Sequence, residues 1–250
     1  MIDWGLSINR GLLTGLNDAF IISAEKRAEL IKEDPKSAEI IRPILRGRDI
    51  KRYGYHFADL YLIVAHNGNK KQRVPRIDID NFPAIKNHLD SFGKKLVDRA
   101  DQGDTPYNLR NCVYMDDFSK HKIVWGNLCL SAQFALAEEN IYVNAPSPMI
   151  VPGNKYVLAV LNSKVGDWYI RQLGVTRNGG YFEYKPMFVE KLPIPLITEE
   201  EQQPFVQLVD QILQAKSSNS DTLNFEHEID ELVFSLYKLN TEEINYILNS

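Results

Sequence analysis

The sequence predicts an α+β fold in which a body of mixed β-sheet is followed by a helical appendage. Short apolar runs typical of buried strands alternate with helix-forming stretches as far as Pro195. After that residue, apolar side chains recur only with the spacing of amphipathic helices. We therefore expect one domain over residues 1–197 and the helical appendage over residues 198–250.

The first half of the body is expected to contain both strands and helices. Gly11 and Gly15 mark a loop that leads into an apolar run ending at Ile22. Ser23 is a typical helix N-cap, and prolines at 35 and 43 end the helical stretches that follow. The expected elements are a short strand ending at residue 22, helices over 24–32 and 37–41, a strand over 58–64, and a helix beginning at 82.

The second half is expected to alternate in the same way before it becomes purely helical. Proline cannot donate to a central ladder, so residues 189–195 are expected to form an extended edge segment. The prolines at 146, 148 and 152 indicate a turn, and the glycine-rich residues 174–184 a loop. The other expected elements are strands over 122–125, 134–137 and 141–143, and helices over 156–161, 165–173, 200–215, 225–236 and from 241.

Composition places the chain among globular proteins with an uneven charge. No apolar run approaches the roughly 20 residues that span a membrane, and the first residues lack the features of a signal peptide, so we expect a cytoplasmic protein. Residues 42–122 hold 16 Lys/Arg and 10 Asp/Glu, whereas residues 199–250 hold 2 and 11. The basic middle suits a phosphate backbone, and the acidic end either suits a different partner or is a solvated helical pair.

No catalytic motif of the expected kinds is present. A methyltransferase needs a glycine-rich cofactor loop, and an adenine-N6 enzyme an Asn/Asp-Pro-Pro-Tyr/Phe strand end; residues 144–148 have the wrong proline spacing. Glu183 and Lys185, with Asp167 before them, match part of a metal-dependent nuclease motif, but Asp167 is expected in a helix. The five histidines lack metal-ligand spacing, and the two cysteines are far apart.

Exposed basic loops are the remaining candidate for function. Arginine bonds guanine edges with two donors, asparagine bonds adenine, and lysine contacts phosphates. Such side chains gather in four expected loops, which predicts a surface for nucleic acid. The candidate DNA-binding residues are Arg46, Arg48, Lys51, Arg52, Lys70, Lys71, Arg73, Arg110, Arg177 and Asn178.

Four ordered motifs resemble a known family. They are Gly11-x-x-Thr14-Gly15-x-Asn17-x-Ala19-Phe20-Ile21-Ile22, Ile41-x-Pro43-x-Leu45-x-Gly47-Arg48-Asp49-Ile50-x-x-Tyr53, Leu158-Ala159-Val160-Leu161-Asn162-Ser163-Lys164 and Leu192-Pro193-Ile194-Pro195. Together they resemble the C-terminal specificity region of TaqI-like adenine-N6 DNA methyltransferases and type IIG restriction-modification enzymes. Within the second motif, two interpretations of Asp49 stay open. Asp49 either has a structural role, in which it holds the Arg48 or Arg52 side chain, or it has none.

The resemblance implies that residues 1–197 are a target-recognition domain that reads double-stranded DNA and contributes no catalytic residue. Its implied partner is an N-terminal methyltransferase domain or subunit that binds S-adenosylmethionine, so no cofactor is expected on this chain and no membrane is implied. Two alternatives stay open: a metal-dependent nuclease using Glu183 and Lys185, and a protein-interaction domain that binds no nucleic acid.

Overall fold

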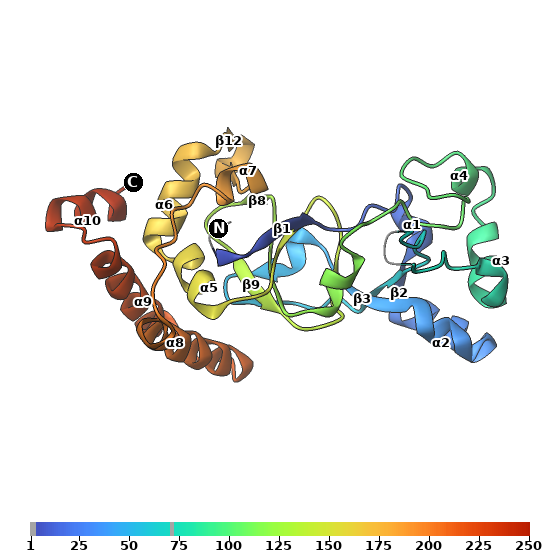
Figure 1. The fold of residues 1–250 in the computed structure, drawn as a ribbon, viewed down its shortest axis with the longest axis horizontal. Helices are drawn as coiled ribbons and strands as arrows, with labels where there is room; N and C mark the ends of the chain where they lie inside the picture. The colour runs from blue at the N-terminus through green and yellow to red at the C-terminus, as the bar shows by residue number, and fades with distance from the viewer. Residues whose placement is uncertain (1–3, 71–72) are drawn as a thin grey trace.

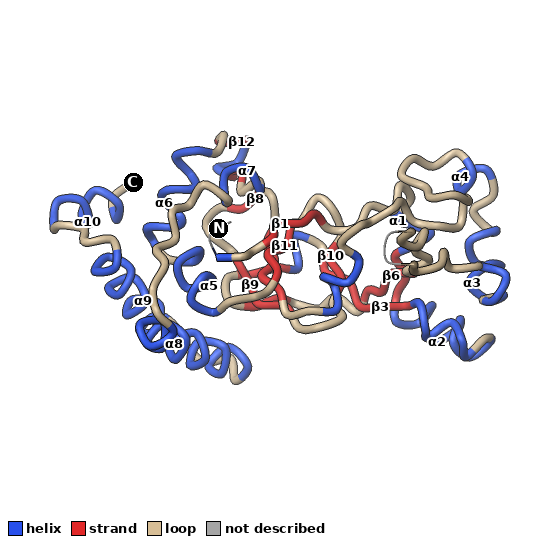
Figure 2. The backbone as a smooth tube through the Cα atoms, viewed as in Figure 1, coloured by secondary structure: helices blue, strands red, loops and turns tan. Residues whose placement is uncertain are grey.

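The computed structural model describes residues 4–70 and 73–250. The molecule is elongated, with the C-terminal helices at one end, helices α2 to α4 at the other, and most strands between them (Figure 1). Helices and strands alternate through the body, and within the described residues no strand follows Glu183 (Figure 2). The predicted mixture of strands and helices, with helices only at the C-terminal end, is confirmed.

Four small sheets form the centre of the molecule. The first sheet is antiparallel and has the order β1–β11–β7–β9, whereas the second, β10–β3–β6–β2, contains one parallel pair, β10 with β3. The strands of the first are Ser7–Arg10, Pro148–Val151, Lys122–Trp125 and Phe134–Ala137, and those of the second are Tyr142–Val143, Ile41–Leu45, Leu60–Ile63 and Ile21–Ser23. The other two sheets are β12–β13–β8 (Thr176–Arg177, Tyr181–Glu183, Leu128–Cys129) and β4–β5 (Ile50–Lys51, Gly54–Tyr55).

The first sheet is a wall between two hydrophobic cores. Side chains alternate along a strand, so neighbouring residues point to opposite faces. On β7, Ile123 and Trp125 belong to one core and Val124 to the other; on β11, Ile150 and Met149 divide in the same way. Because both faces are covered, β7 is buried at every position, which explains its uninterrupted apolar sequence apart from Lys122.

The core on one side of this wall contains the second sheet and the early helices. Helix α2 (Ala24–Glu33) begins at Ser23, whose side chain accepts a hydrogen bond from the Lys26 N–H, as an N-cap does. Three further helices complete this half: α1 (Asn17–Phe20), α3 (Pro83–Asp90) and α4 (Lys94–Val97). The apolar spacing that predicted one helix from residue 82 is divided in the structure between α3 and α4.

The core on the other side contains the later helices. They are α5 (Lys155–Asn162), α6 (Lys164–Leu173), α7 (Pro186–Val189), α8 (Glu199–Ser217), α9 (Leu223–Leu236) and α10 (Thr241–Leu248). Phe205 and Val209 of α8 share this cluster with Tyr156 of α5 and Ile123 of β7. The appendage is therefore packed onto the body, and the boundary near Ile197 stays a prediction. None of the described helices combines the length and apolarity needed to cross a membrane.

Several local expectations were wrong. The turn expected over residues 146–152 instead contains strand β11. The strand accommodates Pro148 because this residue stands at its first position, where a missing N–H donor is tolerated. The loop expected over residues 174–184 contains strands β12 and β13, joined through Gly179 and Gly180, whose φ angles are 79° and 77°.

Two other segments also differ from expectation. The short helix expected over residues 37–41 is a 3₁₀ helix over Pro35–Ile40, and Ile41 already belongs to β3. Pro43 lies inside β3, where it pairs with Tyr61 of β6. Among residues 189–195 no strand forms; α7 ends at Val189, and the Leu192 and Ile194 side chains are buried in the second core.

Asn162 joins the first sheet to the later helices. Its side chain donates to the Phe134 carbonyl oxygen at 2.9 Å and accepts from the Phe134 N–H at 3.0 Å. Replacing Asn162→Ala leaves that buried N–H without a partner, which should lower the free energy of unfolding by about 2 kcal/mol or more. Urea denaturation measures the change, with Asn178→Ala on the surface as a control expected to change it by less than about 0.5 kcal/mol. Equal stability of the two variants would contradict this role.

Lys122 gives the fold a pH dependence. Its side chain is fully buried and donates to the Glu138 carbonyl oxygen, and burial lowers the pKa of Lys122 from 10.5 to about 8. Below pH 8 the folded protein holds a buried charge that the unfolded chain holds in water. This buried charge lowers the free energy of unfolding. As the pH rises from about 8 to about 10.5, the folded protein loses the charge before the unfolded chain does, so the free energy of unfolding should rise.

Lys122→Met removes this titration. The variant should be more stable than the natural protein at pH 7, and its advantage should shrink by pH 10. The difference between the two unfolding free energies, measured at both pH values, isolates Lys122 because the other titrating groups are common to both proteins. A difference that is independent of pH would show that Lys122 does not titrate in this way.

Candidate nucleic-acid interface

The loop over residues 46–52 is closed by an ion pair. The Arg46 guanidinium donates to both carboxylate oxygens of Asp49, at 2.9 and 2.7 Å, and the Arg46 N–H donates to the same carboxylate at 2.8 Å. Burial raises the pKa of Asp49, but the hydrogen bonds from Arg46 outweigh it and hold the pKa below its ordinary value. Asp49 therefore holds Arg46, rather than Arg48 or Arg52.

The other cations of this loop have different roles. Arg48 is exposed, and Lys51 is exposed with its ammonium donating to the Arg48 carbonyl oxygen at 2.9 Å. Arg52 turns inward: its guanidinium donates to Glu226 of α9 and to the Asn162 carbonyl oxygen of α5. Arg48 and Lys51 remain available to a ligand, whereas Arg52 fastens the loop to the later helices.

A buried arginine shapes the second basic region. Arg99 is only 5% exposed, and its guanidinium makes hydrogen bonds to the carbonyl oxygens of residues 14, 100, 101, 106 and 108. It also lies 4.6 Å from the ring centroid of Phe20. Burial lowers the pKa of Arg99 to about 10, so the group stays charged near neutral pH. The Arg99 side chain thus lies at the centre of the irregular segment 99–111, and its hydrogen bonds to the main-chain carbonyl oxygens hold the segment in place.

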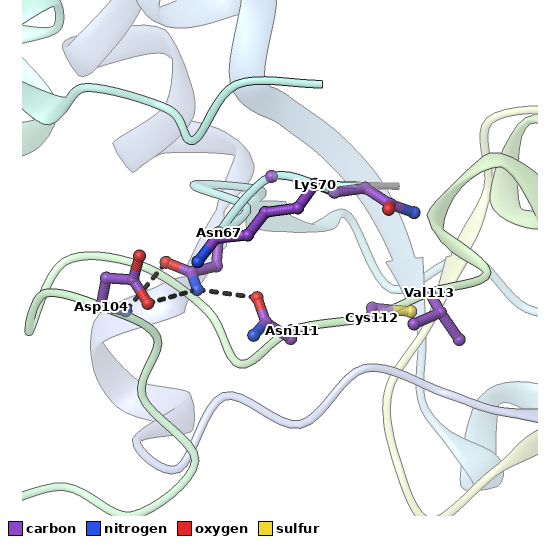
Figure 3. A pocket seen from close by; sticks show the side chains of 8 residues that line it. Asn67, Lys70, Asp104, Asn111, Cys112 and Val113 are labelled. Atoms are coloured by element: carbon purple, nitrogen blue, oxygen red, sulfur yellow. Dashed lines mark hydrogen bonds between the residues drawn. The ribbon is translucent and has the colours of Figure 1, made fainter. Parts of the chain in front are cut away.

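Two asparagines, the buried Asn108 and the half-buried Asn67, make further hydrogen bonds to segment 99–111. The Asn108 amide donates to the Ile77 carbonyl oxygen at 2.9 Å and accepts from the Thr105 hydroxyl at 2.6 Å. Asn67 accepts from the Asp104 N–H at 2.8 Å and donates to the side chains of Asp104 and Asn111, at 3.0 and 2.7 Å (Figure 3). These bonds join the loop after β6 to segment 99–111.

Two adjacent hollows lie at this region, and among the described residues only the first is lined by both of the joined loops. The first hollow is lined by residues 67–70, Asp104 and residues 111–113, and Lys70 extends along its rim (Figure 3). The second hollow is lined by residues 10–13 and 110–114. Asn111, Cys112 and Val113 line both, and we call these three residues the ridge. Basic side chains border both hollows.

The predicted residues of this region are placed as follows. Lys70 and Arg73 are exposed, and Arg73 adopts the left-handed backbone region with φ of 57°. Arg110 is 61% exposed and pairs with Asp101 at 3.0 Å. Lys71 lies outside the described residues. Lys70 and Arg110 therefore lie at the same pair of hollows, although they are 40 positions apart in the sequence.

The fourth predicted loop is a β-hairpin on a three-stranded sheet. Register places Arg177 opposite Tyr181 and Leu128 opposite Glu183, so these side chains share one face. Arg177 is 54% exposed and donates to Glu183, while Asn178 lies exposed in the turn. Leu128, Leu130, Val175 and Tyr181 are between 42% and 53% exposed, so this face is largely apolar.

The acidic residues near this hairpin are engaged in structural contacts. Glu183 accepts from Arg177 and lies 2.8 Å from the Lys185 ammonium, and these partners hold the pKa of Glu183 below its ordinary value. Asp167 lies in α6, as expected, and accepts from the Tyr184 hydroxyl and the Ala132 N–H. Asp167 is thus contacted by Tyr184, whereas the contacts of Glu183 are with Arg177 and Lys185. Within the described residues, no group of three or more metal-ligating side chains is present.

Sequence reasoning missed the residues that organise the second region. Arg10, Asn67, Arg99 and Val113 were not among the candidate residues. A single arginine in an irregular segment has no periodic pattern that could indicate burial. Only the long-range contacts, such as the bond from Arg99 to Thr14 at 2.6 Å, show its role.

Comparison with known proteins settles the family. The TaqI-like C-terminal specificity domain matches residues 42–194 of this chain. The chain belongs to this family. The match contains the Gly47-Arg48-Asp49 loop, both hollows except residues 10–13, and the hairpin, so the features described above lie within or beside the specificity domain. The resemblance carried by the sequence motifs is thereby confirmed.

The chain is also similar to a curated methyltransferase and to two solved structures. The chain is 23% identical over 246 residues to the type II methyltransferase M.MjaIV of Methanocaldococcus jannaschii, covering 92% of this chain and 78% of that protein. The type IIL restriction-modification enzyme MmeI, solved in complex with DNA, has the same fold over 98% of this chain, with a TM-score of 0.73 and 12% identity. This chain spans 36% of the MmeI chain. The type IIG restriction endonuclease BpuSI matches 92% of this chain with a TM-score of 0.48 and 14% identity.

The stability of the specificity domain should depend on the buried Arg99 guanidinium. A lysine has three donors on one nitrogen and cannot reach the carbonyl oxygens that the planar guanidinium of Arg99 reaches. Arg99→Lys should lower the free energy of unfolding by about 3 kcal/mol, because several buried carbonyls lose their partner. It should also speed hydrogen exchange at the Leu109 and Arg110 amides, whose bonds to Ala65 and Asp101 depend on the same frame.

The matched control is Arg110→Lys, because the Arg110 side chain of the natural protein is 61% exposed. Its unfolding free energy should change by less than about 1 kcal/mol. If both variants have the same stability, Arg99 is not the residue that holds this segment.

Proposed function

We propose that this chain reads a specific sequence of duplex DNA as the specificity part of an adenine-N6 methyltransferase of the restriction-modification class. The observation that supports it most is the match of the specificity domain to residues 42–194, combined with basic loops that meet at the two hollows. Cations around rigid, amide-lined hollows provide phosphate contacts and base contacts on the same surface.

The division of the cations supports the same function. Arg48, Lys51, Lys70 and Arg73 are exposed and suit phosphate or base contacts, and Arg110 and Arg177 present partly free guanidinium groups. Arg46 and Arg52 are held by acids of the protein and position their loop. We therefore propose the first group as the DNA-contacting residues, with Asn178 beside Arg177, and the second as its support.

We also propose that catalysis belongs to a separate methyltransferase domain or subunit. That part would bind S-adenosylmethionine and transfer the methyl group to an adenine flipped out of the duplex, since the target atom is inaccessible inside the stack. The engagement of Glu183 by Arg177 and Lys185 supports a non-catalytic role for this chain. An intracellular location follows from the proposed substrate.

One observation favours a second candidate, a protein-interaction domain. Exposed apolar side chains gather on the face of the β12–β13–β8 sheet, at Leu128, Leu130, Val175 and Tyr181. Contiguous apolar patches of this kind often mark contacts with other proteins. Such binding would be insensitive to salt, which distinguishes it from binding to DNA.

Salt dependence tests the proposed function. Binding of the chain to duplex DNA should weaken as salt rises, and each lost phosphate contact should flatten the slope of log affinity against log salt by about 0.9. Arg48→Ala with Lys70→Ala should therefore reduce the slope by up to about 2 and weaken all sequences to a similar extent. Fluorescence anisotropy over a salt series measures both quantities.

Lys238→Ala is the matched control. Lys238 is exposed after α9 in the acidic appendage, so the variant loses one positive charge far from the hollows. Its slope should equal that of the natural protein. A natural protein whose affinity does not change with salt would refute DNA binding, and a double variant that behaves like Lys238→Ala would place the phosphates elsewhere.

A further inference from the structure

We propose that the ridge side chains Asn111 and Val113 determine sequence specificity, by contacting a thymine edge in the major groove of the target. This inference rests on the proposed function, since it names the residues that would read the sequence.

The ridge lies between two hollows that are bordered by cations. Lys70 lines the first hollow, and Arg10 and Arg110 line the second. Among the described residues that line these hollows, Asp104 is the only acidic one, and it accepts a hydrogen bond from Asn67. Phosphates on either side of a groove can therefore approach these cations, and the ridge then faces the base edges between them.

The ridge is held in a fixed shape. Arg99 and Asn108 fix the segment that precedes it, and the Leu109 N–H donates to the Ala65 carbonyl oxygen at 2.8 Å. A recognition element benefits from such support, because a mobile loop must lose entropy when it binds.

The hydrogen-bond network determines what Asn111 offers. The Asp104 N–H can only donate, so the atom of Asn67 that meets it is the oxygen. The Asn67 amino group consequently faces Asn111, whose oxygen accepts at 2.7 Å. The Asn111 amino group is left to donate to a ligand, and base acceptors in the major groove include the thymine O4.

Val113 supplies the apolar contact. Its side chain is 73% exposed, more than any other large apolar side chain among the described residues, and it lines both hollows. A methyl group is the one apolar feature of a base edge in the major groove, and on thymine it stands next to O4. An amino donor and an apolar side chain on one ridge therefore match thymine better than any other base.

Selection from randomised duplexes tests this inference. The full chain is used at low salt, and the bound duplexes are sequenced for the natural protein, Asn111→Asp, Val113→Ser and the control Val97→Ser. Asn111→Asp keeps the oxygen that accepts from Asn67 but removes the amino donor. Val97 is 54% exposed on α4, away from both hollows. Base preference is the readout because the added charge of Asn111→Asp weakens all sequences alike.

We expect the natural protein to select a site with at least one required thymine. Asn111→Asp and Val113→Ser should lose the preference at that position, whereas Val97→Ser should keep it. Replacing that thymine by uracil removes only the methyl group, and should weaken the natural protein about three- to tenfold but leave Val113→Ser unchanged.

The outcomes separate this inference from the proposed function. If the natural protein selects a sequence and both ridge variants select the same one, the ridge does not determine specificity, while DNA reading stands. If the natural protein enriches no sequence, the proposed function fails and this inference fails with it.

Discussion

The guanidinium of Arg99 is buried among main-chain carbonyl oxygens, and its hydrogen bonds within the described residues go to these oxygens rather than to a carboxylate. Removing a charge from water is costly, and here hydrogen bonds from all three nitrogens, together with the Phe20 ring, offset that cost. The arrangement fixes the path of segment 99–111, and through Asn67 and Asn108 it fixes the loop after β6. The shape of the hollows and of the ridge depends on these hydrogen bonds to the irregular chain.

The first sheet has a comparable role for the molecule as a whole. Because its strands are covered on both faces, each core is completed by side chains of the same strands. The half with the hollows and the half with the later helices are thereby joined through β7 and β11. Arg52 adds a second connection, from the loop over residues 46–52 to α5 and α9.

The sequence was informative where periodicity or end signals act locally. Ser23 begins α2, and the apolar spacing of residues 200–236 predicted α8 and α9. It misled where long-range pairing overrides local preference, as at Pro148, which begins a central strand, and at Gly179 and Gly180, which join a hairpin. The basic loops of the candidate site were found from composition. Which cations are engaged, such as Arg46 and Arg52, and which residues frame the ridge depend on contacts between distant segments.

The main-chain bonds to Arg99 make the shape of the segment largely independent of its amino-acid sequence. Among the described residues, the hydrogen bonds of the guanidinium go to main-chain oxygens, those of Thr14 and of segment 99–111, and every amino acid supplies such an oxygen. Exposed side chains along the segment, unlike that of the buried Asn108, can therefore change without altering the path of the chain. If the ridge reads the target sequence as proposed, substitution on the ridge would change that sequence at little cost in stability. Divergence of recognition and preservation of fold would then be independent processes in this lineage.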